Sequence, residues 1–205
     1  MIIMSKIIVV ANIKGGVAKT TTSVFLAITL SKFGKVLLKD ADVNGMASDW
    51  VRTAEEKGYP VPFDYQISNQ RDLPKGLEKY DYVIIDTAGN DPRTVDVASR
   101  FSDLLVVPTG SGSGEYVLGK ETYEFVQNRI PVRMLVSRVL YITRSFKELQ
   151  NSLAEDEHII PFKTMIPQLE VFKTAQYTIP SRPHELREFR ELADEIVELL
   201  DGGIK

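Results

Sequence analysis

Short runs of largely apolar residues recur along the chain and do not alternate with polar positions as one-sided strands do. The runs lie at residues 7–11, 36–39, 82–85, 104–108 and 134–139. Strands that are buried on both faces of a parallel sheet show this pattern. The chain is therefore expected to contain a central parallel sheet.

Between these runs, apolar residues recur at helical spacing. The expected helices include residues 20–33, 95–101 and 115–128. Gly34 should end the first of them, and Pro92 should begin the second, because proline suits the first turn of a helix. Ser145 and Glu148 form the signature of a capping box and predict the start of a further helix.

A last helix is expected to begin near Pro183 and to end at the glycines 202–203. Its apolar residues are Leu186, Phe189, Leu192, Ile196 and Leu199. Strands that alternate with helices predict an α/β fold of three layers, with a mainly parallel twisted sheet between helices. Ligands of such sheets bind at the carboxyl ends of the strands.

Composition adds limits to this picture. The 205 residues suit one domain, 1–205, with a substantial core. No run approaches the roughly 20 apolar residues of a membrane span, and the apolar start lacks a cleavage site. Without cysteine and with two histidines, the chain offers no disulfide, iron–sulfur or multi-histidine site. Since the net charge is −3, nucleic-acid binding would require a local basic patch.

The segment NIKGGVAKTTT, residues 12–22, lies between the first strand and the first helix. Glycines there let backbone N–H groups converge on phosphate oxygens, and the helix N-terminus adds positive potential. Lys19 would then contact the β- and γ-phosphates, and the Thr20 hydroxyl would bind Mg²⁺. A strand–turn–helix corner with a solvated lysine is the alternative. The expected nucleotide-binding residues of the loop are Lys14, Gly15, Gly16, Val17, Ala18, Lys19, Thr20 and Thr21.

Ile13 and Ala18 stand where the general phosphate-loop pattern has glycine. The loop instead resembles the deviant loop K-G-G-x-G-K-T of the ParA/MinD family of P-loop ATPases. This resemblance implies an ATP-dependent homodimer, in which Lys14 reaches the phosphates of the ATP held by the partner subunit. Ala18 departs from the family as well. If the backbone needs positive φ there, alanine costs about 1–2 kcal/mol, and nucleotide affinity should suffer.

Residues 36–50, VLLKDADVNGMASDW, resemble the family's strand-to-switch segment, which usually reads D-x-D-P-Q. Asp40 and Asp42 match its two aspartates. The resemblance gives Asp42 the role of orienting or activating the attacking water near Mg²⁺, which is what loose phosphoryl transfer chiefly requires. A pair of capping or turn aspartates is the alternative. Val43 and Asn44 replace the usual Pro-Gln.

Residues 82–90, YVIIDTAGN, have the form of a Walker B strand that ends in Asp86. A carboxylate at that strand end would hold Mg²⁺, in part through water. The Gly89 N–H could sense the γ-phosphate. The expected catalytic residues are thus Lys14, Lys19 and Asp42, and the expected metal ligands are Thr20, Asp42 and Asp86.

Weaker signals lie further along the chain. Arg138 and the segment 166–168 stand where the family receives the adenine base, so Arg138 and Pro167 are expected to bind nucleotide. Arginine or proline after an apolar strand is nevertheless common. The glycine-rich segment 110–114 is interpreted as a plain flexible connector, with a place on a dimer face as the alternative.

Within the family, the absence of cysteine excludes the branches that ligate iron–sulfur clusters. The terminal helix is acidic, and anionic lipid would repel it, unlike the basic anchor of the MinD branch. No segment before the first strand could hold a helix-turn-helix, so operator binding is not expected. A short ParA-type partition ATPase remains, weak in intrinsic rate, cytoplasmic and nucleoid-associated.

Proteins of this type, the resemblance implies, bind DNA without sequence preference as ATP dimers and hydrolyse ATP when a ParB-like centromere-binding partner stimulates them. Plasmid or chromosome segregation would be the function. Two alternatives stay open: a ParA-like ATPase that positions a non-DNA cargo, and a P-loop metabolic ligase-like enzyme. The candidate DNA-binding residues are Arg129, Arg133, Arg144, Lys147, Lys163, Lys173, Arg182 and Arg187.

Overall fold

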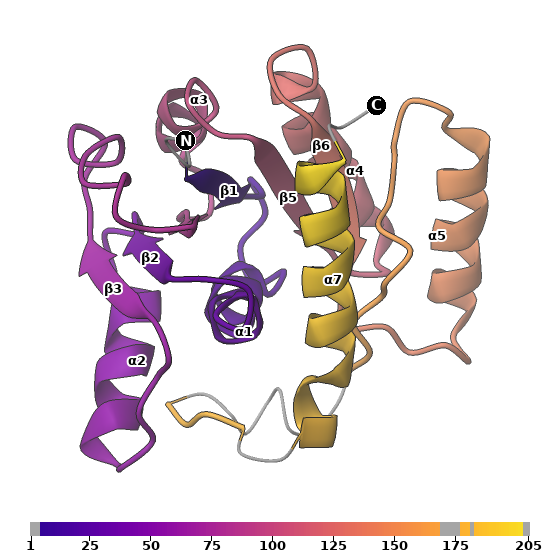
Figure 1. The fold of residues 1–205 in the computed structure, drawn as a ribbon. Coiled ribbons are helices and arrows are strands. Elements are labelled where there is room, and N and C mark those ends of the chain that lie inside the picture. The colour runs from indigo at the N-terminus through magenta and orange to yellow at the C-terminus, as the bar shows by residue number, and fades with distance from the viewer. Residues whose placement is uncertain (1–4, 169–176, 181–182, 203–205) are drawn as a thin grey trace.

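The computed structural model describes residues 5–168, 177–180 and 183–202. Its centre is a six-stranded sheet in the order β3-β2-β4-β1-β5-β6, and every pair of neighbouring strands is parallel (Figure 1). This confirms the predicted α/β fold. The strands are β1 Lys6–Val10, β2 Val36–Asp40, β3 Asp64–Ile67, β4 Tyr82–Asp86, β5 Leu104–Thr109 and β6 Val132–Val136.

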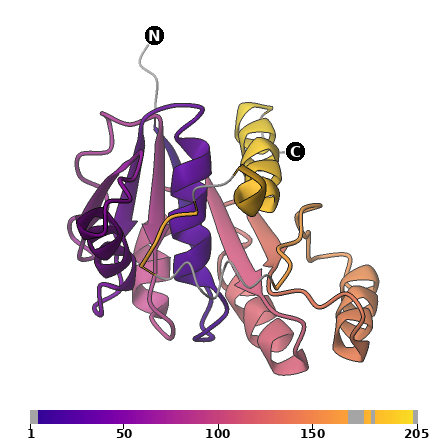
Figure 2. The same cartoon turned by 90° about the horizontal axis from the view of Figure 1, so that it is seen from below.

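Helices cover both faces of the sheet (Figure 2). Side chains of a strand alternate between its faces, so Ile8 and Val10 of β1 pack with α1, α2 and α7, while Ile7 and Val9 pack with α3 and α4. The helices are α1 Lys19–Leu30, α2 Met46–Glu56, α3 Pro92–Ala98, α4 Ser113–Val126, α5 Arg144–Glu155 and α7 Arg187–Asp201; the 3₁₀ turn Pro183–Leu186 precedes α7.

Two elements were not expected from the sequence. β3 is a short edge strand whose residues are mostly exposed, so it lacks the apolar run by which the other strands are recognised. Helix α2 begins inside the segment 36–50, which was interpreted only as a switch region, and extends beyond it. The predicted start of α5 is also wrong: the capping residue is Thr143, whose Oγ1 accepts the Phe146 N–H at 3.3 Å, and not Ser145.

The segment 159–168 covers the outer edge of β6. Its Ile160 carbonyl accepts the N–H of Met134 at 3.0 Å, and its Ile166 N–H donates to Val136 at 2.9 Å. Pro161 and Pro167 form isolated bridges to the β6 side of the sheet. Proline cannot donate to a further strand, so the covered edge resists pairing with another chain.

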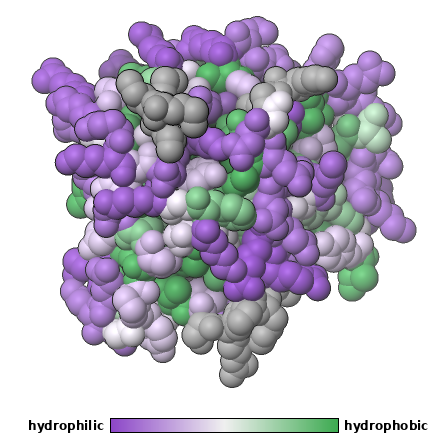
Figure 3. All heavy atoms as spheres, in the orientation of Figure 1, coloured by the Kyte–Doolittle hydropathy of each residue, from purple (hydrophilic) through white to green (hydrophobic). Residues whose placement is uncertain are grey.

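The terminal helix α7 packs against α1, and its apolar stripe is core, as expected. Phe189, Leu192 and Ile196 are buried, and the Phe189 ring meets the edge of Phe25 at a centroid distance of 5.1 Å. Figure 3 shows mainly hydrophilic side chains on the face that carries α7. In the ranges given above, no helix combines the length and the apolar character needed to cross a bilayer.

Candidate active site

The loop between β1 and α1 is anchored at its base by buried hydrogen bonds. Asn12 is buried; its Nδ2 donates to the Pro108 carbonyl at 2.7 Å, and its Oδ1 accepts the Lys14 N–H at 2.8 Å. The Ile13 N–H donates to Thr122 Oγ1 of α4 at 3.0 Å. The base of the loop is therefore held by β5 and α4, which are distant in sequence.

Two residues of the loop have left-handed backbone. Gly16 has φ of 74° and Ala18 has φ of 68°. Glycine adopts this conformation without strain, whereas alanine at position 18 costs about 1–2 kcal/mol. The backbone at position 18 thus has the left-handed conformation that suits the family's glycine, and alanine adopts it at a cost in free energy.

The Lys19 side chain folds back over this loop. Its ammonium donates to the Lys14 carbonyl at 2.9 Å, and the residue is buried. Burial lowers the pKa of Lys19, while the charges of Asp86 and Asp42 act in the opposite direction. The ammonium therefore lies within the loop, where it has a carbonyl partner that a phosphate oxygen could replace.

Asp86, at the end of β4, lies directly behind the start of α1. Its carboxylate accepts hydrogen bonds from Thr20 Oγ1 at 2.9 Å and from Ser23 Oγ at 2.8 Å. Burial, together with the nearby Asp40 charge, raises the pKa of Asp86 to about 7, although the hydrogen bonds from Ser23 and Thr20 act in the opposite direction. Ser23 was missed in the sequence, although it lies three residues after Thr20 and so on the same face of the helix.

The two aspartates after β2 have different surroundings. Asp40 is buried and accepts the N–H groups of Ser48, at 2.7 Å, and of Asp42, at 3.1 Å; burial raises its pKa. Asp42 is half-buried and accepts the Asn44 N–H at 2.8 Å. The capping alternative therefore describes Asp40, which fixes the start of α2, while Asp42 faces the cavity described next.

These groups surround a cavity of about 440 Å³. Its lining residues are Gly15, Gly16, Ala18, Lys19, Thr20, Thr21, Asp42, Met46, Trp50, Thr87, Gly89 and Arg138. Met46, Trp50 and Thr87 were not expected there. The first two come from α2, which the sequence did not reveal.

Four of the predicted site residues do not line this cavity. Lys14 is exposed, Val17 is buried beneath the loop, and Asp86 lies behind Thr20. Pro167 pairs with Val139, one residue beyond Arg138. Lys14 thus belongs to the loop without presenting its side chain to the chain's own pocket.

The loop after β4 approaches the phosphate loop closely. A Cβ on Gly89 would lie 3.2 Å from the Gly15 Cα and 3.5 Å from Lys19 Nζ. The Asn90 N–H donates to the Ile13 carbonyl at 2.9 Å. Glycine at position 89 thus keeps backbone, and no side chain, beside the Lys19 ammonium.

The donors at this site fit a hydrated Mg²⁺ beside phosphates. Thr20 contributes a hydroxyl, and Asp86 and Asp42 contribute carboxylates. Mg²⁺ is usually held by one or two protein oxygens together with phosphate oxygens and water, and needs no all-protein cage. The described part of the chain contains no cluster of three or more His, Cys, Asp or Glu suited to a metal ion.

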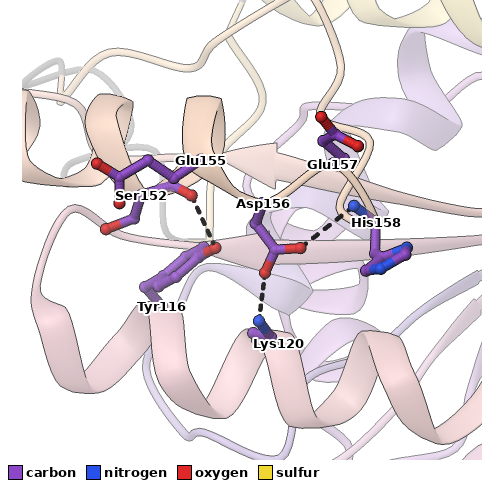
Figure 4. A pocket seen from close by; sticks show the side chains of 7 residues that line it. All are labelled: Tyr116, Lys120, Ser152, Glu155, Asp156, Glu157 and His158. Atoms are coloured by element: carbon purple, nitrogen blue, oxygen red, sulfur yellow. Dashed lines mark hydrogen bonds and ion pairs between the residues drawn. The ribbon is translucent and has the colours of Figure 1, made fainter.

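Two further hollows flank the site region. One, of about 850 Å³, borders Asp42, Val43 and Ile67 on the side of β3. The other, of about 490 Å³, lies between α4 and the end of α5 (Figure 4). There Lys120 is ion-paired with Asp156, whose carboxylate also accepts the His158 N–H at 3.2 Å. No predicted site residue lies in this second hollow.

The candidate DNA-binding residues do not gather on one surface. Arg133 is buried and donates to the carbonyl of its neighbour Val132, so its assignment as a DNA contact is wrong. Arg129 precedes β6 and is ion-paired with Asp96. Arg144 follows β6 and so lies beyond the other end of that strand. Lys147 and Lys163 are exposed, and Arg187 is ion-paired with Glu188. Lys173 and Arg182 lie outside the described residues.

Sequence comparison finds a family model and two relatives that match parts of the chain. A family model described as an AAA domain matches residues 5–59. The chain is 37% identical over 108 residues to the maintenance of carboxysome distribution protein A of Gloeobacter kilaueensis, and 26% identical over 127 residues to its counterpart in Halothiobacillus neapolitanus. These matches cover 51% and 58% of the chain, but only 49% and 57% of the two relatives.

Structural comparison covers nearly the whole chain. A putative plasmid partition protein of Borrelia burgdorferi, solved with AMPPNP, aligns with a TM-score of 0.78 at 21% identity, over 95% of this chain and 99% of that one. Apo McdA from Cyanothece aligns with a TM-score of 0.75 at 20% identity, over 94% and 99%.

Cobyrinic acid a,c-diamide synthase of Mycobacterium smegmatis also aligns, with a TM-score of 0.71 at 18% identity, over 98% of each chain. At such identities the likeness concerns the fold, which serves several functions. Together with the match over the phosphate loop, it confirms the resemblance to the ParA/MinD P-loop ATPases.

Proposed function

We propose that the protein is an ATPase that binds ATP with Mg²⁺, forms a dimer in that state, and uses hydrolysis to position a cargo. The support is the cavity at the phosphate loop, in which Lys19, Thr20 and Asp42 converge. Relatives and neighbours that are named for partition or distribution share the fold.

In this proposal each residue has a physical task. The backbone of Gly15–Thr20 and the Lys19 ammonium bind the phosphates, and Thr20 and Asp86 hold the metal ion. Bound Mg²⁺ would neutralise charge that develops on the phosphate oxygens. Asp42 orients the attacking water, because it lines the cavity from the loop after β2 and its backbone is fixed through Asp40.

The proposal that the protein forms a dimer rests on the contrast between two lysines of one loop. Lys19 is buried against the loop, whereas Lys14 is exposed and does not line its own cavity. A lysine of this loop that does not line its own cavity is available to the phosphate site of another copy. The exposed position of Lys14 suits that role.

The test compares Lys14→Ala and Lys19→Ala, with the exposed Lys32→Ala as the control. Lys19→Ala should abolish ATP binding, since Lys19 is the only lysine among the described residues that line the pocket. Lys14→Ala should still bind ATP but should lose ATP-dependent dimerisation and hydrolysis. Calorimetry would measure binding, and light scattering with and without ATP would measure dimerisation. Normal dimerisation of the Lys14 variant would rule out the two-lysine sandwich.

For the cargo, we propose DNA segregation with nonspecific DNA as the track and a ParB-like stimulating partner. Arg144, which is ion-paired with Glu148, and Lys147 lie at the exposed start of α5 and, with the exposed Lys163, are described candidates for phosphate contacts. Dimerisation would double their number on one particle. Affinity should fall steeply with salt, with a log–log slope of roughly −0.9 per phosphate neutralised.

A second candidate cargo is a protein assembly, with an adaptor protein in place of the ParB-like partner. The relatives that match the chain in sequence are named for carboxysome distribution, which favours this version. Both versions require the protein to bind nonspecific DNA. Titrating the protein with DNA in the presence of ATP, of ADP and without nucleotide would measure this binding. DNA binding that is absent with ATP, or equal in all three states, would favour a metabolic P-loop enzyme instead.

A further inference from the structure

Arg138 follows β6 and is the residue through which that strand reaches the nucleotide cavity. Its backbone is left-handed, with φ of 55°, a conformation that costs energy for a residue with a side chain. The Nε atom of Arg138 is buried and has no hydrogen-bond partner within the described structure. A strained backbone at the cavity wall indicates that the position serves a ligand.

The guanidinium of Arg138 is ion-paired with Glu115, in the first turn of α4. The other carboxylate oxygen of Glu115 faces the N–H of Gly112 at 3.4 Å. Arg138 is thus held from the side of α4, and the ion pair leaves its Nε free. Because a guanidinium is planar, an ion pair on one edge also fixes the plane of the whole group.

Gly110 makes room for this ion pair. A Cβ at position 110 would lie 2.1 Å from Glu115 Oε2 and 2.9 Å from an Arg138 guanidinium nitrogen. Gly110 is buried, so the interpretation of this part of the segment as a plain flexible connector is wrong. The atoms that would clash belong to the ends of the two paired side chains, and no backbone atom is among them.

The same region is bonded to the phosphate loop. Ser137 Oγ, one residue before Arg138, lies 3.3 Å from the Val17 carbonyl and 3.1 Å from the Thr109 carbonyl, within hydrogen-bonding distance of both. The Arg138 backbone is therefore held at a fixed place relative to the loop that binds phosphates. Only the direction of its side chain remains to be set, and Glu115 sets it.

We propose that Glu115 is a positioning residue that aims Arg138 at the base end of the nucleotide, and that glycine at position 110 is required for this arrangement. The inference rests on the proposed ATP site. Arg138 would stack on the base or donate to it, while Lys19 and the loop bind the phosphates. Glu115 should then affect ATP and not a triphosphate without a base.

The first experiment measures the dissociation constants of ATP and of inorganic tripolyphosphate, each with Mg²⁺, by calorimetry. Glu115→Gln should weaken ATP binding about tenfold, the loss expected for one charge-assisted contact, and should leave tripolyphosphate binding within about twofold. Glu121→Gln, the same change at an exposed site of α4, is the control. Equal weakening of both ligands would reduce Glu115 to a structural helix cap and overturn the inference.

A double-mutant cycle separates positioning from general damage. In an Arg138→Ala background, Glu115→Gln should have no further effect on the ATP constant, because its only proposed target is gone. Additive losses from the two changes would contradict the mechanism. If the parent protein bound neither ATP nor tripolyphosphate, the proposed function itself would fail, and the inference with it.

Substitution of Gly110 gives a second test, in which Glu115 and Arg138 keep their side chains. Gly110→Ala should displace the carboxylate and weaken ATP binding about as much as Glu115→Gln does. Gly114→Ala is the matched control, because a Cβ there meets no atom within 4 Å. Combined with Glu115→Ala, the Gly110→Ala change should lose most of its effect. Unchanged ATP affinity in Gly110→Ala would show that the ion pair is not needed for base binding.

Discussion

The two loops that flank the nucleotide cavity are held in different ways. The phosphate loop is bonded to distant parts of the core, through Asn12 to Pro108, through Ile13 to Thr122 and through Val17 to Ser137. In the loop after β2, Asp42 and Asn44 bond mainly to each other.

Exposure differs in the same way: Asn12 is 1% exposed, whereas Val43 beside Asp42 is 93% exposed and borders the largest hollow described above. The comparison indicates that the two loops have different tasks. In the proposed function, phosphates would bind to a preformed site, whereas Asp42, the proposed water-orienting residue, lies on an exposed loop with fewer bonds to the core.

The largest effect is expected at Asp42, on the exposed loop after β2. Asp42→Ala should lower kcat about 100-fold or more, while the ATP dissociation constant changes only a few-fold, because the carboxylate acts mainly in the transition state. The variant should accumulate as an ATP-bound dimer. Single-turnover kinetics and light scattering would measure both properties. Hydrolysis at the parent rate would remove Asp42 from the mechanism.

A matched pair of asparagines tests the difference in anchoring. Asn12→Ala removes two hydrogen bonds, one of them the buried bond to the Pro108 carbonyl, so the free energy of unfolding should fall by about 2 kcal/mol or more. Asn44→Ala, on the exposed loop, should change it by about 0.5 kcal/mol or less. Denaturant titration would measure both. Equal losses would mean that the two loops are anchored alike.

Asp86 gives a pH-dependent prediction for the nucleotide-free protein. Its pKa is about 7 in the folded state against 3.8 as the ordinary value, so the folded state binds more protons between these limits. Stability should therefore fall as pH rises from about 4 to 7. Asp86→Asn removes this loss of stability. The Tm of the variant minus the Tm of the parent should therefore be several degrees larger at pH 8 than at pH 5.

Thermal unfolding by circular dichroism at the two pH values, without Mg²⁺ or nucleotide, would measure this difference. Addition of Mg²⁺ with ATP should raise the Tm of the parent more than that of Asp86→Asn, since only the parent has a carboxylate at position 86 for the metal ion. A Tm difference that does not vary with pH would contradict the assignment of the raised pKa.

The smallest effect is expected at Ala18. Ala18→Gly relieves a left-handed backbone that costs about 1–2 kcal/mol, although part of this gain is offset by the greater freedom of glycine in the unfolded chain. ATP affinity should rise a few-fold and the free energy of unfolding by about 1 kcal/mol or less. Calorimetric titration would compare the two proteins. Equal affinities would mean that the loop tolerates alanine without cost to binding.

Much of the phosphate site could be predicted from the sequence because its parts are local. Ile7 to Thr22 form strand, loop and helix in one continuous stretch, and Lys19 and Thr20 take their places from the short-range geometry of a helix start. Asp86 was recognised for a similar reason, since a carboxylate that follows a buried strand lies at the ligand-binding edge of a parallel sheet. The same reasoning failed at β3, whose exposed residues carry no apolar run.

The tertiary structure decided which distant residues meet. Arg133 has the charge of a DNA contact, but it lies within β6 and is buried. Glu115, Gly110 and Arg138 have no common pattern in the sequence, and they converge only because β5 and β6 are neighbours in the sheet and α4 follows β5. Charge and spacing along the chain determine what a residue could do, whereas burial and strand order determine what it touches.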